Sequence, residues 1–334
     1  MCEPGDLVLV TGANGFLGSH LVESLLAAGM RVRCMVRRSR DQSFIRHLPV
    51  EWAYADVSSA AGLPAACRGV DSICHCAALT RAPNQETFFR VNTDGTTALA
   101  RAALEAGAGL KRFLFVSSLA AAGPSLAPDD VLDEWQPPHP ITWYGKSKWA
   151  AEQALLNMCN GDQPLPVTIV RPAAVFGPRD RDFFANFRLI QRGLNLQLDS
   201  ERRALSLIYV HDLVDLILLA LQAPQALGQT YFASAWVHSH AELCCAIARA
   251  LNHRAICLKL PRATLVPMSL WSRAQCRITG RPPLLNDQRV LDLKAPYWVC
   301  SAARAARELG FAPRYDLAGA VRETADWYRE QGWL

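Results

Sequence analysis

A tyrosine and a lysine stand four residues apart in the segment YGKSK, at Tyr144 and Lys148. On a helix this spacing places both side chains on one face. A phenol with an ordinary pKa of about 10 is a poor acid-base catalyst at neutral pH. A neighbouring ammonium, together with an oxidised nicotinamide, favours the phenolate and lowers that pKa. Ser118, at the end of the apolar segment RFLFVSS, could bind the same substrate oxygen. We therefore predict proton transfer at a carbonyl or hydroxyl oxygen; the alternative is an exposed Tyr and Lys on an amphipathic helix.

A glycine-rich segment, TGANGFLG, separates an apolar strand from a helix-like segment. Gly12 permits a tight turn, Gly15 lets the backbone approach a ligand, and Gly18 allows the helix to pack closely on the strand. The helix then presents free N–H groups to a pyrophosphate. This context predicts a dinucleotide site, and the alternative is an ordinary loop before a helix. The predicted contacts are Thr11, Gly12, Asn14, Gly15, Phe16, Leu17 and Gly18.

The end of the second predicted strand distinguishes NADP(H) from NAD(H). A carboxylate there would bind the ribose 2′-hydroxyl, whereas an arginine would bind a 2′-phosphate. The chain has Arg37 and Arg38 and no acid at this point. We therefore favour NADP(H), with NAD(H) as the alternative and a solvated basic loop as a third interpretation. Asp56 and Val57, after the third strand, are assigned to the adenine side; Asp56 could instead cap a short helix.

Apolar segments alternate with helix-like segments through the N-terminal half of the chain. This alternation predicts an α/β fold whose parallel sheet is covered by helices on both faces. After Pro172 the alternation weakens, so we expect substrate-binding elements there. A Pro- and Asp-rich stretch, 123–140, predicts a long loop over the sheet. The expected strands are 7–10, 31–36, 50–55, 72–78, 112–118 and 167–172.

Several further motifs occur in a fixed order along nearly the whole chain. They are TGANGFLG (11–18), HCAA (75–78), VNTDGT (91–96), VSS (116–118), YGKSKWAAE (144–152), RPAAVFGP (171–178), IYVHDLVD (208–215) and ARELGFAP (306–313). Together they resemble the extended short-chain dehydrogenase/reductase family, of the NAD-dependent epimerase/dehydratase type. The resemblance implies a doubly wound parallel Rossmann sheet, assigned to 1–171 and about 205–235. It also implies a smaller C-terminal α/β substrate-binding region, assigned to about 172–204 and 236–334.

The resemblance assigns roles to particular residues. Catalysis falls to Ser118, Tyr144 and Lys148, with Lys148 also binding the nicotinamide ribose. Asn92 would lie near the active-site helix, and a homodimer would form through the helices that bear Asn92 and Tyr144. The remaining cofactor contacts that it implies are Ala77, Ala78 and the backbone around Pro172 to Val175.

Departures from the family pattern narrow the range of substrate classes that we expect. Members that dehydrate nucleotide sugars carry an acid pair after the catalytic serine or threonine, but Leu119 and Ala120 follow Ser118. Many nucleotide-sugar epimerases hold a phosphate with an arginine in the segment before V-x-D, where this chain has Leu205 to Ile208. The stretch SSLAAAGP instead is similar to 3β-hydroxysteroid dehydrogenases and dihydroflavonol reductases.

Composition excludes several other classes of protein. The 334 residues carry a net charge of only +5 with both signs mixed, so charge gives no reason to expect nucleic acid. No apolar run approaches the roughly 18 residues needed to span a bilayer, and we expect a cytoplasmic protein with reduced cysteines. No set of residues has metal-ligand spacing. Segment 257–283 is predicted to cover the substrate, to touch a membrane peripherally, or to pack as core.

We therefore expect an NADP(H)-dependent oxidoreductase that reduces a ketone, or oxidises the matching secondary alcohol, on a mostly apolar, steroid- or flavonol-like small molecule. One alternative is a nucleotide-sugar 4-epimerase with tightly bound NAD(P), which the resemblance also allows. Another is a non-catalytic NADP(H)-sensing regulator, although such a protein has no need for an acid-base pair.

Overall fold

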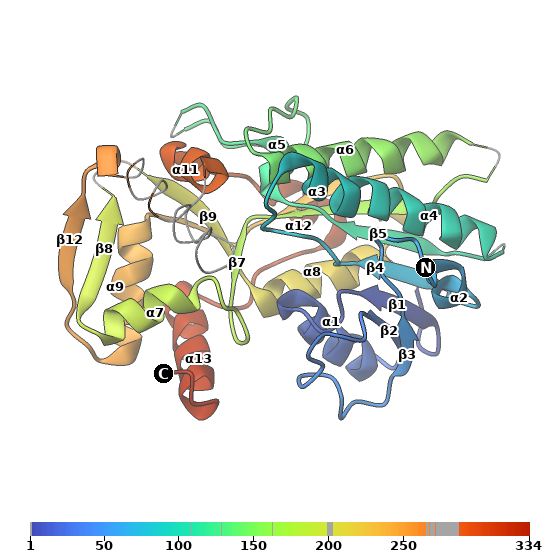
Figure 1. Ribbon diagram of the computed structural model, residues 1–334, viewed down its shortest axis with the longest axis horizontal. Helices are drawn as coiled ribbons and strands as arrows, with labels where there is room; N and C mark the ends of the chain where they lie inside the picture. The colour runs from blue at the N-terminus through green and yellow to red at the C-terminus, as the bar shows by residue number, and fades with distance from the viewer. Residues whose placement is uncertain are drawn as a thin grey trace.

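A seven-stranded parallel sheet forms the larger part of the molecule (Figure 1). The computed structural model describes residues 2–107, 109–127, 129–161, 163–198, 203–264, 267, 271 and 287–334. The strand order is β10-β6-β5-β4-β1-β2-β3, and every pairing is parallel. The strands are β1 (Leu7–Thr11), β2 (Arg31–Val36), β3 (Glu51–Tyr54), β4 (Ser72–His75), β5 (Arg112–Val116), β6 (Val167–Pro172) and β10 (Thr230–Ala233).

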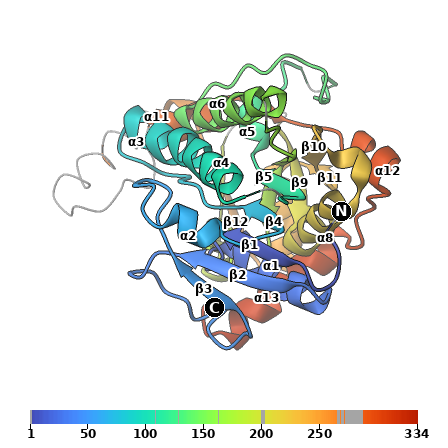
Figure 2. The same cartoon turned by 90° about the vertical axis from the view of Figure 1, so that its right-hand side faces the viewer.

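Helices cover both faces of this sheet, as expected for a doubly wound Rossmann fold (Figure 2). Because side chains alternate along a strand, Val8 and Val10 face one apolar core while Leu9 faces the other. The first core contains α1 (Phe16–Ala27), α8 (Val210–Gln222) and α12 (Ala303–Leu309). The second contains α2 (Leu63–Cys67), α4 (Gly95–Glu105) and α6 (Trp143–Asn157). Short helices α3 (Gln85–Phe89) and α5 (Leu119–Ala122) and a π-helix (Arg90–Asp94) complete this part.

A smaller region carries two further sheets. One contains β7 (Ala174–Phe176), β9 (Ala204–Tyr209), β11 (Trp236–His238) and β13 (Tyr297–Trp298); the other pairs β8 (Leu194–Leu198) with β12 (Ile256–Leu260). Their helices are α7 (Phe184–Gln191), α9 (His240–Leu251), α11 (Asp287–Lys294) and α13 (Leu317–Glu330). The assigned division of the chain stays a prediction: α12 lies in the part given to substrate binding, yet its Ala305 and Leu309 are buried in a core of the main sheet.

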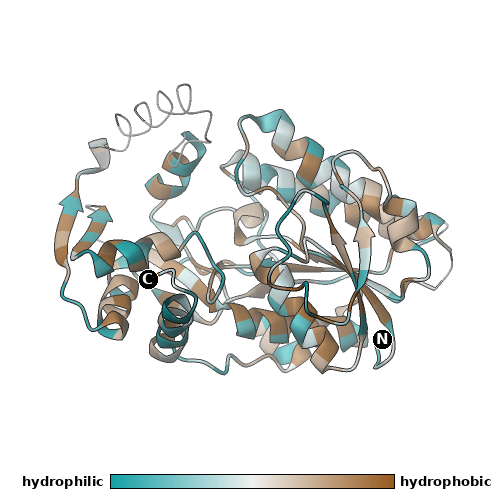
Figure 3. Ribbon diagram, turned by 60° about the horizontal axis from the view of Figure 1, so that its bottom comes forward, coloured by the Kyte–Doolittle hydropathy of each residue, from teal (hydrophilic) through white to brown (hydrophobic). Residues whose placement is uncertain are grey.

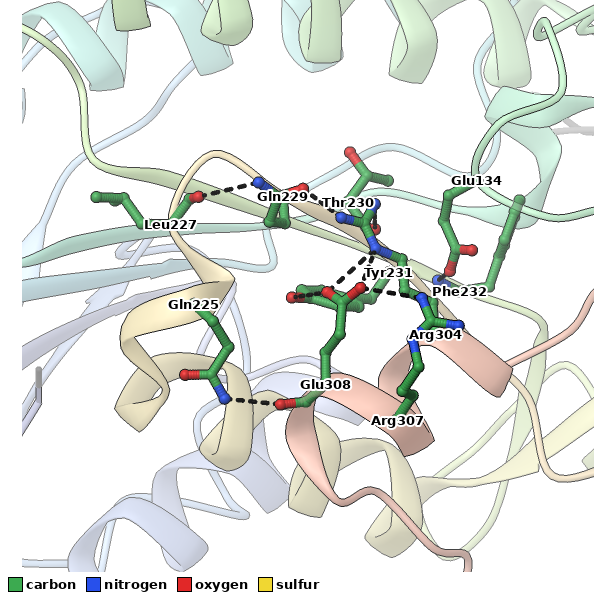
Figure 4. A network of polar contacts seen from close by, with 10 residues as sticks. All are labelled: Glu134, Gln225, Leu227, Gln229, Thr230, Tyr231, Phe232, Arg304, Arg307 and Glu308. Atoms are coloured by element: carbon green, nitrogen blue, oxygen red, sulfur yellow. Dashed lines mark hydrogen bonds and ion pairs between the residues drawn. The ribbon is translucent and has the colours of Figure 1, made fainter.

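The long loop predicted at 123–140 supports the edge of the main sheet (Figure 4). The N–H of Phe232, on edge strand β10, donates to Glu134 Oε1 at 2.8 Å. From α12, Glu308 accepts from the Tyr231 hydroxyl at 2.9 Å, and Arg304 donates to the same carboxylate at 3.1 Å. Covering an edge strand in this way prevents its pairing with another chain.

Candidate active site

Ser118 and Tyr144 are brought together by the close approach of two helices. Ser118 follows β5 and caps α5, where its hydroxyl accepts from the Ala120 N–H at 3.1 Å. Thr142 begins α6 by accepting from the Gly145 N–H at 3.1 Å. A Cβ on Gly145 would lie 2.1 Å from the Ala120 carbonyl oxygen, so only glycine allows this contact. The Ser118 hydroxyl consequently lies near the Tyr144 side chain, whose pKa it lowers.

Lys148 lies one helical turn beyond Tyr144, as the spacing predicts, and its side chain is almost fully buried. Its Nζ donates to the Val116 carbonyl at 2.6 Å and lies 3.9 Å from the centre of the Phe115 ring. Burial lowers the pKa of Lys148 to about 7, although the nearby Glu152 carboxylate opposes this shift. The lysine is therefore poised to gain or lose its charge near neutral pH.

The acid-base state of Tyr144 depends on its burial and on two neighbouring side chains. Burial raises the pKa of Tyr144, the hydrogen bond from Ser118 lowers it, and the charge of Asp292 raises it further. The lowering expected from Lys148 together with an oxidised nicotinamide stays a prediction; in this structure Lys148 is directed at Val116 and Phe115. A raised pKa keeps the Tyr144 phenol protonated, which suits it to donate a proton.

A buried ion pair between Glu152 and Arg171 lies next to Lys148, and the sequence analysis did not identify it. Glu152 lies one turn beyond Lys148 on α6. Its carboxylate accepts from Arg171 Nη2 at 2.5 Å and Nε at 3.0 Å, and it also accepts from the Ser117 hydroxyl. All three side chains are buried. The i, i+4 spacing of Lys148 and Glu152 was a usable signal, but the arginine comes from a different strand.

The glycine-rich turn has the geometry required to receive a pyrophosphate. Gly12 has a φ of +65°, and a Cβ there would lie 2.9 Å from the Ala77 nitrogen. A Cβ on Gly18 would lie 2.2 Å from the Gly12 carbonyl oxygen, so the helix could not pack so closely. Gly15 begins α1 without any side-chain cap, and no acid lies in the first turn. The N–H groups are thus left for an anion, which fits a dinucleotide.

A series of hydrogen bonds links the end of β1, the end of β4 and helix α4 beneath the glycine-rich turn. The Ala77 N–H donates to the Thr11 hydroxyl at 3.1 Å, which bonds to His75 Nδ1 at 2.6 Å. On the other side of the ring, Nε2 bonds to the Thr96 hydroxyl at 2.8 Å, and Thr96 donates to the Asn92 carbonyl at 2.7 Å. Burial lowers the pKa of His75 to about 3, so the ring is neutral. The Thr11 side chain is therefore engaged in positioning Ala77.

Asn92 connects two parts of the site, in agreement with its expected place near the active-site helix. It lies in the π-helix, and its amide side chain bonds to the backbone of Leu79 at 2.8 and 3.0 Å. It also donates to the Ser147 hydroxyl on α6 at 3.0 Å. Asn92 thus holds the chain that follows β4 against the helix of Tyr144.

The basic pair expected to select NADP(H) lies beside Asp56. Arg37 Nη1 is 3.9 Å from Asp56 Oδ2, and the Arg38 guanidinium lies 4.3 Å from the centre of the Tyr54 ring. Asp56 Oδ1 accepts from the Ser58 N–H at 2.9 Å. The alternative that Asp56 caps a helix is wrong, because Gly62 occupies the N-cap of α2.

The remaining predicted contacts fall into three groups. Asn14 donates to the Asp41 carbonyl at 2.8 Å and so fixes the loop after β2. Phe16 and Leu17 pack against the core of the smaller region. The others are placed as follows: Val57 is buried beside Gly95, Ala77 and Ala78 follow β4, Pro172 ends β6, and Val175 pairs with Ile208.

Helix α11 brings the smaller region to the catalytic residues. Gln288 Oε1 accepts from the Trp143 N–H at 2.7 Å, next to Tyr144. Asp292 lies one turn further along α11, and burial raises its pKa to about 6. Sequence analysis did not identify either residue. Most of the segment 257–283, expected to cover the substrate, lies outside the described residues.

Metal sites, disulfides and membrane-spanning helices are absent from the described part of the chain. No group of three His, Cys, Asp or Glu side chains there could hold a metal ion. The ten cysteines that the structure describes are all free thiols. None of the helices that are described has the length and apolarity needed to cross a membrane.

Comparison with known proteins agrees with this geometry. The chain is 31% identical over 330 residues to the ceramide reductase of Caulobacter vibrioides (strain NA1000 / CB15N), covering 98% of this chain and 96% of the relative. It is 28% identical to the UDP-glucose 4-epimerase of Vibrio cholerae, in a match that covers 95% of this chain and 94% of the relative. The crystal structure of gox2253 superposes with a TM-score of 0.82 at 30% identity, covering 98% and 99%.

The family resemblance is confirmed at the level of sequence profiles. A 3β-hydroxysteroid dehydrogenase/Δ5→4-isomerase and a putative dihydroflavonol 4-reductase match at 28% identity. The names of these two proteins and of the ceramide reductase denote reduction or dehydrogenation, which are reactions of C=O or CH–OH groups. Residues 8–232 match the profile of the NAD dependent epimerase/dehydratase family, so the chain belongs to that family of enzymes.

Proposed function

We propose that the protein is an NADP(H)-dependent reductase of a ketone on a mostly apolar small molecule. The observation that carries this proposal is the placement of Ser118 beside Tyr144, with Lys148 one turn away on α6. The three residues provide an oxygen-binding hydroxyl, a proton donor and a cation at the end of β5.

Tyr144 donates its phenolic proton to the carbonyl oxygen while Ser118 holds that oxygen in place. When bound, the nicotinamide supplies the hydride that the carbonyl carbon accepts. With its pKa raised, the Tyr144 phenol carries a proton at neutral pH that it can donate to the carbonyl oxygen. Lys148, charged below its pKa of about 7, would bind the ribose and return a proton to Tyr144.

The cofactor proposal rests on the turn before α1 and on the two arginines. Gly15 and the free N–H groups of α1 would bind the pyrophosphate, and Arg37 with Arg38 would bind the 2′-phosphate. Asp56 would repel the 2′-phosphate, but Arg37 lies 3.9 Å from its carboxylate and partly offsets that negative charge.

A titration with NADPH and separately with NADH tests the choice of cofactor. The parent should bind NADPH at least about tenfold more tightly, a difference of about 1.4 kcal/mol. Arg37→Asp should abolish that preference, whereas Arg46→Asp, an exposed change beyond the site, should leave it unchanged. Equal binding of both cofactors by the parent would refute the preference for NADP(H).

Two observations support an apolar substrate. Strand β9 has Leu205 and Leu207 in the segment where many nucleotide-sugar epimerases carry a phosphate-binding arginine. The similarity to a ceramide reductase, whose name denotes a lipid substrate, points the same way. We therefore infer that the substrate is a ketone attached to a long hydrocarbon or fused-ring skeleton.

A nucleotide-sugar 4-epimerase is the second candidate, because the chain also resembles a UDP-glucose 4-epimerase along nearly its whole length. Such an enzyme would use the same three residues. We expect UDP-glucose and UDP-galactose to leave the melting temperature of the protein unchanged. A clear stabilisation by either sugar nucleotide would favour the epimerase.

We also propose that residues from both assigned regions bind one small-molecule substrate. Separately, we propose that the chain forms a homodimer. Helices α4 and α6, which would pair across the two-fold axis, lie side by side on the outer face of the sheet (Figures 1 and 2). Light scattering in solution tests the dimer, and a monomer at all protein concentrations would contradict it.

A further inference from the structure

Strands β8 and β12 form a two-stranded parallel ribbon with one uniformly aliphatic face. Ile256 pairs with Leu194, Leu258 with Leu196, and Leu260 with Leu198. Because side chains alternate along a strand, all six point to the same side of the ribbon. We call this side the ribbon face, formed by Leu194, Leu196, Leu198, Ile256, Leu258 and Leu260.

The ribbon face is turned toward solvent. Ile256 is 68% exposed, Leu258 43% and Leu194 37%. Asn195, on the opposite side of β8, is only 8% exposed, and its Oδ1 has no hydrogen-bond partner. On β8 the amide is thus buried while Leu194 opposite it is exposed, the reverse of the usual order. Leu196, Leu198 and Leu260 are half-buried, and β12 is exposed on both sides from Ile256 to Lys259.

The ribbon lies at the end of the molecule opposite the edge of the main sheet formed by β1 to β3 (Figure 1). Figure 3 shows apolar residues along both strands. A contiguous apolar patch of this kind marks a contact with another molecule, whereas scattered exposed leucines need no such explanation.

Positive charge lies at one end of the ribbon. The chain has no Asp or Glu from residue 183 to 198 or from residue 243 to 264. The Ile256 N–H donates to the Gly193 carbonyl at 2.8 Å, so the starts of β8 and β12, with Arg192 and Arg254 before them, are adjacent. Arg192 and Arg254 are both exposed, so two cations flank this end of the ribbon face. Lys259 is also exposed, but it lies on the other side of β12.

We propose that the ribbon face docks the protein on an anionic lipid bilayer. The aliphatic side chains would enter the boundary between headgroups and acyl chains, and the arginines would contact lipid phosphates. A second copy of the chain suits this surface less well, because joining two ribbon faces would bring the same positive charges together. The proposal concerns binding alone and does not depend on which substrate the enzyme reduces.

Vesicle flotation of the purified full chain tests the proposal. The protein should bind vesicles of phosphatidylcholine mixed with phosphatidylglycerol more tightly than phosphatidylcholine alone, and added salt should weaken the difference. The double variant Ile256→Ser and Leu258→Ser should bind at least about tenfold more weakly, since both side chains lose apolar area. The control is Leu126→Ser with Leu227→Ser, which changes residues that are 80% and 50% exposed elsewhere and should bind like the parent.

A second pair of variants tests the charge. Arg192→Gln with Arg254→Gln should weaken binding to the anionic vesicles by about fivefold for each arginine. Arg46→Gln with Arg101→Gln, at exposed positions of the main-sheet region, should have no effect. NADPH binding and circular dichroism show whether each variant is folded.

Three results would overturn the proposal. In the first, the anionic vesicles do not retain the parent. In the second, the serine variant binds them as tightly as the parent. In the third, light scattering would show a dimer of the parent that the serine substitutions convert to a monomer. That outcome would assign the ribbon face to a second copy of the chain.

Discussion

The main sheet and the β8–β12 ribbon are both parallel and both rich in aliphatic residues, yet they bury these residues differently. Leu9 and Ile73 of the main sheet are fully buried, whereas Ile256 and Leu258 of the ribbon are 68% and 43% exposed. Helices cover both faces of the main sheet. In the ribbon, helices α7 and α9 pack against strand β8. The comparison teaches that residue type alone does not determine burial, which depends on where the connecting helices pack.

The largest expected effect lies on the main-sheet side of this comparison. Tyr144→Phe removes the proton donor but keeps the ring, so we expect kcat for ketone reduction to fall by about 10³-fold. The dissociation constant for NADPH should stay within about twofold, because Tyr144 acts on the substrate oxygen. Steady-state kinetics and a fluorescence titration measure the two quantities. Tyr54→Phe, at an exposed tyrosine of β3, is the control; an equally active Tyr144→Phe would remove Tyr144 from the mechanism.

Matched leucine truncations compare the two regions directly. Leu9→Ala leaves a cavity in a closed core and should lower the free energy of unfolding by about 3 kcal/mol. Leu258→Ala, on the ribbon face, should lower it by less than about 0.5 kcal/mol. Urea denaturation of both variants measures the difference. Similar losses for the two would mean that the ribbon face is packed in solution.

The smallest expected effect is a dependence of stability on pH. The pKa of Lys148 is lowered to about 7 in the folded protein, so above that pH the unfolded chain binds more protons than the native one. Stability should therefore rise with pH, by about 1 kcal/mol between pH 7 and pH 8. Lys148→Met should remove this rise, and Lys146→Met, an exposed change on the same helix, should preserve it. A parent whose stability is flat over this range would contradict the lowered pKa.

Much of the main sheet followed from local sequence patterns. Strands β2 (RVRCMV) and β6 (VTIVRP) have the predicted bounds, because short segments with several apolar residues between helix-like segments are typical of strands. The spacing of Tyr144 and Lys148 correctly predicted their positions on one helix. These features depend on residues close together in the chain, which is why they could be predicted.

Features that depend on distant residues could not be predicted in the same way. Glu152 meets Arg171 across two elements, and Asp292 comes from a helix far along the chain. The raised pKa of Tyr144 combines its burial with the charge of Asp292, and neither is visible in the spacing of YGKSK. The ribbon face was likewise invisible, because a run such as ICLKL could equally predict a half-buried strand.

The central claim is hydride transfer between NADP(H) and a ketone on an apolar skeleton. One assay tests it most directly: purified protein is mixed with NADPH and a long-chain ketone, and with UDP-glucose in parallel, while NADPH absorbance and products are followed. We predict that NADPH is consumed in equal amount to the alcohol formed, and that UDP-glucose is unchanged. Conversion of UDP-glucose to UDP-galactose without net consumption of NADPH would contradict the account.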